Sequence, residues 1–251
     1  AAALCSLVLL TVRRSRRRPP LRRREQHDVV RADLSRLPAD VLAACLDFLT
    51  LQDLALAART STLLHAIATG QLERAWRERN ERLDAILARA LRHQVMLRAQ
   101  AASGTSAPRP HGRLAESTDE VHWLIDEARR VLAAEPSLLE LEAPVRIFGD
   151  LRGHYEALLQ LLPLSGGAPA PCLFLGNYTA RHRSHHSLQL VCLLLALKAR
   201  YPSAVHLLRG VFESAGEGFN RGHAFFAECE HRHGQRTWRR FQSLFEALPF
   251  A

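Results

Sequence analysis

Three short segments of the chain carry charged side chains where a catalytic or anion-binding site would need them. Asp150 and Arg152 stand in GDLRG, Arg181 in GNYTARH and Arg209 in RGVFE, each directly after a short apolar run. Because α/β sheets place their chemistry at the carboxyl ends of parallel strands, the three segments should converge in space. Three guanidinium groups around one pocket could hold an anion. Pairing of the arginines with Glu213 and neighbouring carboxylates is the alternative.

The elements that must position these segments are predicted to be β-α-β units. Three apolar runs end in glycine or a polar residue and are followed by helical periodicity, which is typical of parallel strands joined by helices. Helices are expected near 154–162 and 186–200, preceded by an amphipathic helix, VHWLIDEARRVLA, that starts at Val121. The three predicted strands are Val145–Phe148, Cys172–Leu175 and Val205–Leu208.

The preceding part of the chain predicts a separate helical domain. Residues 34–100 carry apolar residues at helical spacing without strand-like alternation. Three short helices cannot bury so much apolar surface among themselves, so a partner or the neighbouring domain should cover the excess. Residues 101–118 are rich in Ala, Ser, Gly and Pro and predict a linker to a second domain over 119–251.

Residues 1–33 predict a basic, disordered leader. Eight arginines between Arg13 and Arg24 account for most of the net charge of +9, so the basicity belongs to an arm and indicates no specific nucleic-acid groove. The apolar run at 1–12 and the arginines after it leave three alternatives: the end of a membrane or signal segment, a disordered leader with a nuclear-import patch, or a transit peptide. Membrane contact is expected only through this leader. Five spaced cysteines without a CxxC pair favour a reducing compartment, so we expect a cytoplasmic or nuclear protein.

The helical segment resembles a known docking module. The stretch LPADVLAACLDFLTLQDLALAARTSTLLHAIA, followed by Trp76, is similar to the F-box over roughly residues 34–80. The sequence departs from many F-boxes at Leu64, where they carry tryptophan. The resemblance implies binding to a Skp1-type adaptor of ubiquitin ligases, and an ordinary helical hairpin packed on its own neighbour is the alternative. The expected partner-binding residues are Leu37, Pro38, Leu42, Leu46 and Leu49.

The second segment resembles the phosphoprotein phosphatases, closest to their type 1 branch, from about Val121 to the last residue. Besides the three motifs, the resemblance includes CLLLALKARYPSAVHLLRG and the tail FFAECEHRHGQRTWRRFQSLFEALPF. It implies a metallophosphoesterase β-sandwich flanked by helices, of which this chain carries the N-terminal half. The expected fold class is therefore α+β/α/β, with a small all-helical domain in front. Since the rest of the sandwich would follow Ala251, one sheet face should be bare and apolar.

The family cleaves phosphoserine and phosphothreonine with two metal ions held by GDxHG, GDxVDRG and GNHE. In this chain Asp150 and the phosphate-clamping Arg181 match, as do Arg209, Gly210 and Glu213. The remaining motif positions are changed. Arg152 stands at the position of a metal-binding histidine, Asn177 at that of the bridging aspartate and Ala180 at that of the second aspartate. Val211 replaces the metal-ligand asparagine, and Phe212 replaces the acid histidine.

Four of these changes, those at the three metal-ligand positions 152, 177 and 211 and at the acid-histidine position 212, should together abolish the dinuclear mechanism. The resemblance thus implies a pseudophosphatase, not an enzyme, without bound divalent metals or other cofactors, acting as an adaptor or scaffold that binds a phosphoprotein or a phosphatase-associated partner. A phosphatase with residual metal-dependent activity is the alternative. We expect the Arg152 guanidinium to form a fork with Asp150 in place of a metal, so that alanine at 152 would cost a few kcal/mol. The histidines at 182, 185 and 186 are interpreted as a solvated loop, not a zinc site.

Overall fold

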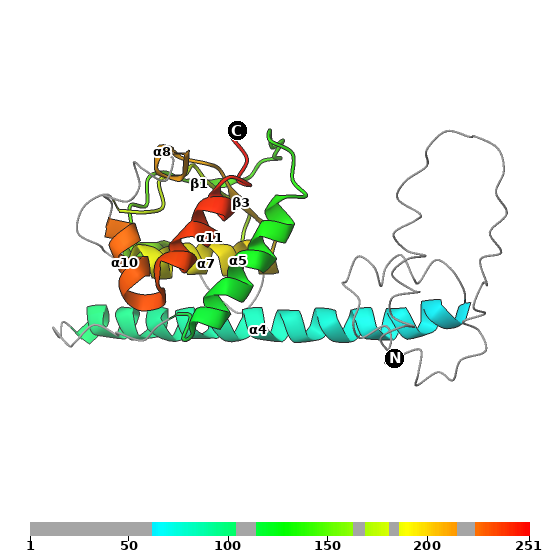
Figure 1. The fold of residues 1–251 in the computed structure, drawn as a ribbon. Helices are drawn as coiled ribbons and strands as arrows, with labels where there is room; N and C mark the ends of the chain where they lie inside the picture. Colours follow the sequence, from blue (N-terminus) through cyan, green and yellow to red (C-terminus); the bar gives the residue numbers. More distant parts are fainter. Residues whose placement is uncertain (1–61, 104–113, 163–168, 181–185, 215–223) are drawn as a thin grey trace. The chain divides into compact units, whose positions relative to one another are not determined.

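The structure, a computed structural model, describes the backbone of residues 62–103, 114–162, 169–180, 186–214 and 224–251 (Figure 1). The chain divides into two compact units, residues 1–80 and residues 81–251. The described residues of the first unit form the start of a 42-residue helix, α4 (Thr62–Ser103), and the rest of this helix belongs to the second unit. The basic leader and the predicted Skp1-contacting residues from Leu37 to Leu49 lie outside the described residues. Among the described helices, none combines the length and apolarity needed to cross a membrane.

The second unit contains a small parallel sheet with helices packed against it. Its elements after α4 are α5 (Thr118–Leu132), β1 (Arg146–Phe148), α6 (Tyr155–Leu161), β2 (Cys172–Phe174), α7 (Ser187–Arg200), β3 (Val205–Leu207), α8 (Val211–Ser214), α10 (Ala224–His233) and α11 (Gln235–Phe245). The strands are parallel in the order β1-β2-β3. Each strand lies within its predicted run, and α6 and α7 lie at the predicted helix positions, so the β-α-β prediction is confirmed.

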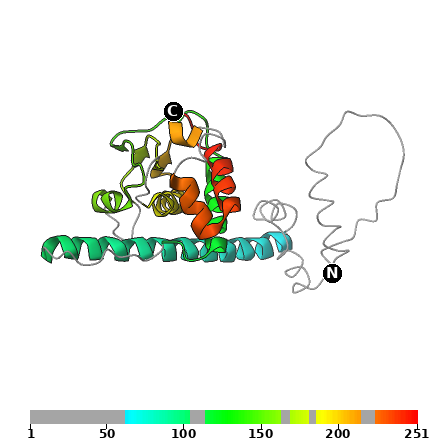
Figure 2. The same ribbon diagram turned by 60° about the vertical axis from the view of Figure 1, so that its left-hand side comes forward.

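Helix α7 forms the centre of the core. Its sequence, SLQLVCLLLALKAR, has no polar stripe, and every residue from Ser187 to Ala199 is buried. A helix that is apolar all round must be covered on all sides. Helices α5, α6 and α10 and strand β3 pack against it. In both views α10 (orange) and α11 (red) lie beside one another, with α11 against α5 (green) (Figure 2).

The two faces of the sheet differ in burial. In β2 and β3 the side chains on one face are buried, namely Cys172, Phe174, Val205 and Leu207. On the opposite face Ile147 is 66% exposed, while Leu173 and His206, which continue its row across the sheet, are half-buried. Three strands in one sheet are all the β-structure in the described part of the chain, so the second sheet of the expected sandwich is not among these residues.

The second-unit part of α4 packs into the core that follows it. Leu83, Ile86 and Ala90 recur at helical spacing and are fully buried. The predicted linker contributes to this packing, because Leu114 is 1% exposed and its carbonyl accepts a hydrogen bond of 2.6 Å from Arg89 Nε. The division between the units therefore falls at residue 80, earlier than the linker predicted over 101–118.

Candidate functional site

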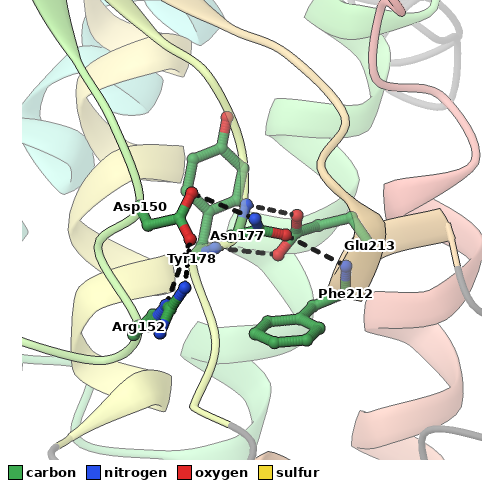
Figure 3. Close-up of polar contacts among 6 residues, drawn as sticks. All are labelled: Asp150, Arg152, Asn177, Tyr178, Phe212 and Glu213. Carbon is green, nitrogen blue, oxygen red and sulfur yellow. Dashed lines mark hydrogen bonds and ion pairs between the residues drawn. The ribbon is translucent and has the colours of Figure 1, made fainter.

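The segments that follow β1, β2 and β3 meet at one end of the sheet, as their positions after parallel strands predict. The first two are joined by backbone hydrogen bonds from Arg152 N to Asn177 O (2.9 Å) and from Gly153 N to Tyr178 O (2.8 Å). The second and third are joined by a hydrogen bond of 3.2 Å from Phe212 N to Asn177 Oδ1. Figure 3 shows the side chains gathered at this junction.

The Asp150 carboxylate is bound on both oxygens by protein donors. Arg152 donates from Nε (3.1 Å) and Nη2 (2.7 Å), and both bonds go to Oδ2. Asn177 Nδ2 donates to Oδ1 at 3.0 Å. The predicted contact between Arg152 and Asp150 is therefore present, but the guanidinium binds one oxygen and does not form a two-oxygen fork. The hydrogen bonds from Arg152, and then that from Asn177, hold the pKa of Asp150 below its ordinary value.

This ion pair lies at the surface. The side chain of Arg152 is 63% exposed and that of Asp150 is 41% exposed. Solvent screens an ion pair in such a place, so its contribution to stability is about 1 kcal/mol or less. The backbone of Arg152 has φ 44°, a left-handed conformation that costs a side-chain-bearing residue free energy. Asn177 is also left-handed, with φ 55°, which asparagine tolerates better than most residues.

A second carboxylate, Glu213, lies beneath the ion pair and is 4% exposed. Its Oε2 accepts hydrogen bonds from the backbone N–H of Asn177 (2.8 Å) and Gly210 (3.1 Å), and its Oε1 accepts one from Tyr178 N (2.9 Å). Burial raises the pKa of Glu213, and the three N–H groups act in the opposite direction. One buried side chain thus connects two of the three segments.

Tyr178 extends the same junction towards the strands. Its hydroxyl lies 2.6 Å from the carbonyl oxygen of Leu208, to which it donates, and 3.2 Å from that of Phe174. Burial raises the pKa of this phenol well above its ordinary value, so the hydroxyl keeps its proton. The end of β2 is thereby fixed to the end of β3.

Two glycines allow the second and third segments to touch. A Cβ atom on Gly176, where φ is 99°, would collide with the backbone N and Cα of Gly210. A Cβ atom on Gly210 would collide with the backbone N of Asn177. Only residues without side chains permit this approach, and the approach brings the Asn177 and Gly210 N–H groups to one carboxylate.

The predicted anion-binding arginines do not share one pocket in the described residues. Arg152 pairs with Asp150, whereas Arg209 donates from Nη2 to the carbonyl oxygen of Glu246 and stacks over the Phe250 ring at 4.3 Å. Arg181 lies outside the described residues, as do His182 and His185. Between the described residues Arg152, Arg209 and Glu213, the carboxylate of Glu213 forms no ion pair with either arginine and accepts from backbone N–H groups instead.

The other altered motif positions lie around the junction. Ala180 is buried, and its N–H donates to Ser187 Oγ at 2.9 Å. Val211 is 67% exposed, and Phe212 is half-buried. Neither of these two side chains has an atom that can bind a metal.

The residues present do not fit the two-metal centre that the family resemblance implies. Among the described residues of the junction, Asp150 is the exposed carboxylate, and both its oxygens already accept hydrogen bonds. Asn177 supplies a neutral amide, whereas a divalent ion prefers anionic oxygen. In the part of the chain that the structure describes, no three His, Cys, Asp or Glu side chains are grouped so that they could hold a metal ion.

The motif resemblance gives Glu213 no structural role, although the sequence contains a signal for one. Gly210 precedes the short helix α8, and Glu213 is its third residue. An acidic residue at this position commonly accepts a hydrogen bond from the N–H of the residue before the helix, as in a capping box. This signal predicts the bond from Gly210 N. It does not predict the bonds from Asn177 and Tyr178, which come from a distant segment.

Comparison with known proteins gives a partial similarity. No protein-family model matches the chain. A solved structure of a protein serine/threonine phosphatase from Saccharomyces cerevisiae, described as similar to human phosphatase PP5, matches 53% of this chain with 28% sequence identity and a TM-score of 0.49. The match covers 44% of that phosphatase chain, so this chain spans less than half of its length.

Proposed function

We propose that residues 119–251 form a serine/threonine-phosphatase-like domain that lacks the two-metal catalytic site and binds other proteins. The observation that carries the proposal is the state of Asp150, whose two oxygens are bound by Arg152 and Asn177. A carboxylate that ligates a metal must direct its lone pairs at the ion. Here the same lone pairs accept hydrogen bonds from a permanent cation and an amide.

The charge at the junction supports the same proposal. Arg152 stands where the resembling family has a metal-binding histidine, and it carries the positive charge that the family obtains from metal. Asn177 stands in place of the bridging aspartate and donates a hydrogen bond, which a carboxylate would not do at neutral pH. The two changes complement each other, because Asp150 is neutralised on one oxygen and hydrogen-bonded on the other.

The rigidity of the junction supports an interaction role. Glu213, Tyr178 and the paired glycines connect the second segment to the third, and backbone hydrogen bonds from Arg152 and Gly153 connect the first segment to the second. A surface that is already ordered loses little conformational entropy when it binds. Exposed apolar side chains, including Val211 beside the junction and Leu175 after β2, offer contact area. The partner in this proposal is a phosphoprotein or a phosphatase-associated protein.

The helical segment supplies the second half of the proposal. We infer from the F-box resemblance that residues 34–80 bind a Skp1-type adaptor and thereby link the phosphatase-like domain to a ubiquitin ligase. The support is the leucine pattern that includes Leu42 and Leu46. Both halves together describe an adaptor that presents a partner to the ligase.

Metal-dependent hydrolysis of p-nitrophenyl phosphate tests the first half. We expect the wild-type chain to give the same rate with and without Mn²⁺, and the same rate as the Asp150→Asn variant. Metal-dependent hydrolysis that disappears in Asp150→Asn would instead establish residual phosphatase activity. Glu230→Gln, an exposed carboxylate on α10, is the control for a general loss of charge.

A pull-down with a purified Skp1-type adaptor tests the second half. We expect binding by the wild-type chain and its loss in Leu42→Glu and Leu46→Glu. Leu161→Glu is the matched control, because Leu161 is 62% exposed on α6 and lies outside the F-box-like segment. Binding that survives both charge substitutions would refute the F-box interpretation and leave the phosphatase-like half unaffected.

A further inference from the structure

Lys198 is the sole lysine among the 251 residues, and its side chain is 0% exposed. It lies near the end of α7, where three groups surround its ammonium. Nζ donates to Glu135 Oε1, to the carbonyl oxygen of Pro202 at 3.0 Å and to that of Val205 at 2.7 Å. An ammonium has three N–H donors, so each has a partner.

This arrangement keeps the amine from acting as a nucleophile. An amine attacks an acyl group through a lone pair, which the protonated, triply hydrogen-bonded Nζ does not have. Burial lowers the pKa of Lys198 below its ordinary value, and the hydrogen bond to Glu135 and the charge of Glu135 act in the opposite direction. The three acceptors around Nζ are the geometric reason to assign the ammonium form. An acyl donor also needs room beside Nζ, and α7 is buried on every side there.

The three partners come from different elements. Glu135 lies just after α5, Pro202 lies in the turn after α7, and Val205 is the first residue of β3. Release of Nζ therefore requires the end of α7 to separate from the segment after α5 and from β3. Since these elements belong to the main core, this opening should need most of the free energy of unfolding of the second unit.

We propose that Lys198 is an acyl-acceptor site that is closed in the folded protein and becomes available only when the second unit unfolds. In the modification, neutral Nζ attacks the carbonyl carbon of an activated ester or ubiquitin thioester. A C–N bond forms, the C–O or C–S bond breaks, the alcohol or thiol leaves, and Nζ loses one proton. Lysine-linked ubiquitin thus marks unfolded copies of these 251 residues and spares folded ones.

This inference stands on burial and hydrogen bonding and does not depend on the proposed function. If the chain also works at a ubiquitin ligase, the inference explains how a folded adaptor avoids modification of its own lysine beside the ligase. If it does not, the folded chain still resists lysine acylation in the same way.

Amine labelling with an N-hydroxysuccinimide acetate, followed by peptide mass spectrometry, tests the proposal on the whole chain. The Arg239→Lys variant supplies an internal reference, because position 239 is exposed on α11. We expect Lys198 to react at least about a hundredfold more slowly than the new amine in the same molecules. In increasing urea, its labelling should rise together with the fraction unfolded measured by circular dichroism.

Two results would overturn the proposal: labelling of Lys198 under native conditions at a rate close to that at position 239, or labelling that rises well before the unfolding transition. A second assay uses transfer of ubiquitin from a thioester-charged conjugating enzyme. Folded Arg239→Lys should form lysine-linked conjugates at position 239, and folded wild-type chain should form none at Lys198. Both assays read the native residue, so neither depends on whether a Lys198 variant folds.

Discussion

The junction at the end of the sheet has two layers that differ in burial. We call Asp150 and Arg152 the rim, and Glu213 with the N–H groups of Asn177, Tyr178 and Gly210 the floor. The rim ion pair is exposed and screened, whereas the floor carboxylate is 4% exposed and hydrogen-bonded three times. Residues at the rim can therefore change at small cost to stability. The floor is where the local fold depends on a single side chain.

Under the proposed function, this difference would allow the metal site of the resembling family to be lost without loss of the fold. Arg152, which stands at a metal-binding histidine position of that family, belongs to the exposed rim. The contacts of Glu213 and Tyr178 involve backbone groups, which a substitution at the rim leaves in place. The exposure of the rim also lowers the loss of stability expected for Arg152→Ala. An exposed ion pair contributes about 1 kcal/mol or less, whereas the few kcal/mol predicted from the sequence would require a buried pair.

The largest effect is expected for Glu213→Ala. This change removes the acceptor of three N–H groups, that of the buried Tyr178 and those of the half-buried Asn177 and Gly210, and each unsatisfied buried group costs about 1–3 kcal/mol. We expect a loss of about 3 kcal/mol or more in the free energy of unfolding from urea titrations. Glu230→Ala, at an exposed position of α10, should change the stability by about 0.5 kcal/mol or less. A loss below about 1 kcal/mol in Glu213→Ala would remove the distinction between floor and rim.

The next effect concerns Asn177, whose side chain donates to Asp150 at the rim and accepts from Phe212 N. Asn177→Asp replaces the donor 3.0 Å from Asp150 Oδ1 with a second carboxylate. We expect a loss of about 1–2 kcal/mol at neutral pH, because a hydrogen bond is lost and like charges face one another. The swapped variant, Asp150→Asn with Asn177→Asp, again pairs one amide with one carboxylate and should recover most of the loss. A swap as unstable as the single variant would contradict this explanation.

The same two layers decide what the sequence could predict. The strands and helices followed from apolar runs and helical periodicity. The Arg152–Asp150 contact followed from the phosphatase resemblance, which puts an arginine beside Asp150 where that family holds a metal. The floor did not follow, because its donors are backbone N–H groups brought together by the contact between Gly176 and Gly210. No side-chain pattern encodes which distant amides a carboxylate will meet.

Two further long-range contacts could not be predicted for the same reason. Arg209 belongs to a motif that predicts an anion site, yet residues at the C-terminal end of the chain, Glu246 and Phe250, hold its guanidinium. Residues 101–118 have the composition of a linker, yet the Leu114 side chain belongs to the hydrophobic core and Arg89 donates to its carbonyl oxygen. In both cases a long-range contact decided the outcome, and local composition carries no information about it.

A smaller effect distinguishes two substitutions of Arg152. Arg152→Ala removes the ion pair and keeps the left-handed backbone, so we expect a loss of about 1 kcal/mol. Arg152→Gly removes the same pair but relieves the φ of 44°, which should make it more stable than the alanine variant by about 1 kcal/mol. Urea titration of both variants measures the difference. Equal stability would mean that the left-handed backbone carries no cost at this position.

The smallest effect is the pH dependence of the rim. The pKa of Asp150 is lowered in the folded state, so the stability that it contributes is present above the ordinary pKa of aspartate and is lost as pH falls through the lowered value. The pKa of Glu213 is raised, so its contribution has the opposite sign and is lost as pH rises through the raised value. The difference in unfolding free energy between wild type and Arg152→Ala should therefore shrink below about pH 4, because the protonated Asp150 no longer attracts the guanidinium. A difference that stays constant from pH 7 down to about pH 3 would show that Arg152 acts through its backbone and not through its charge.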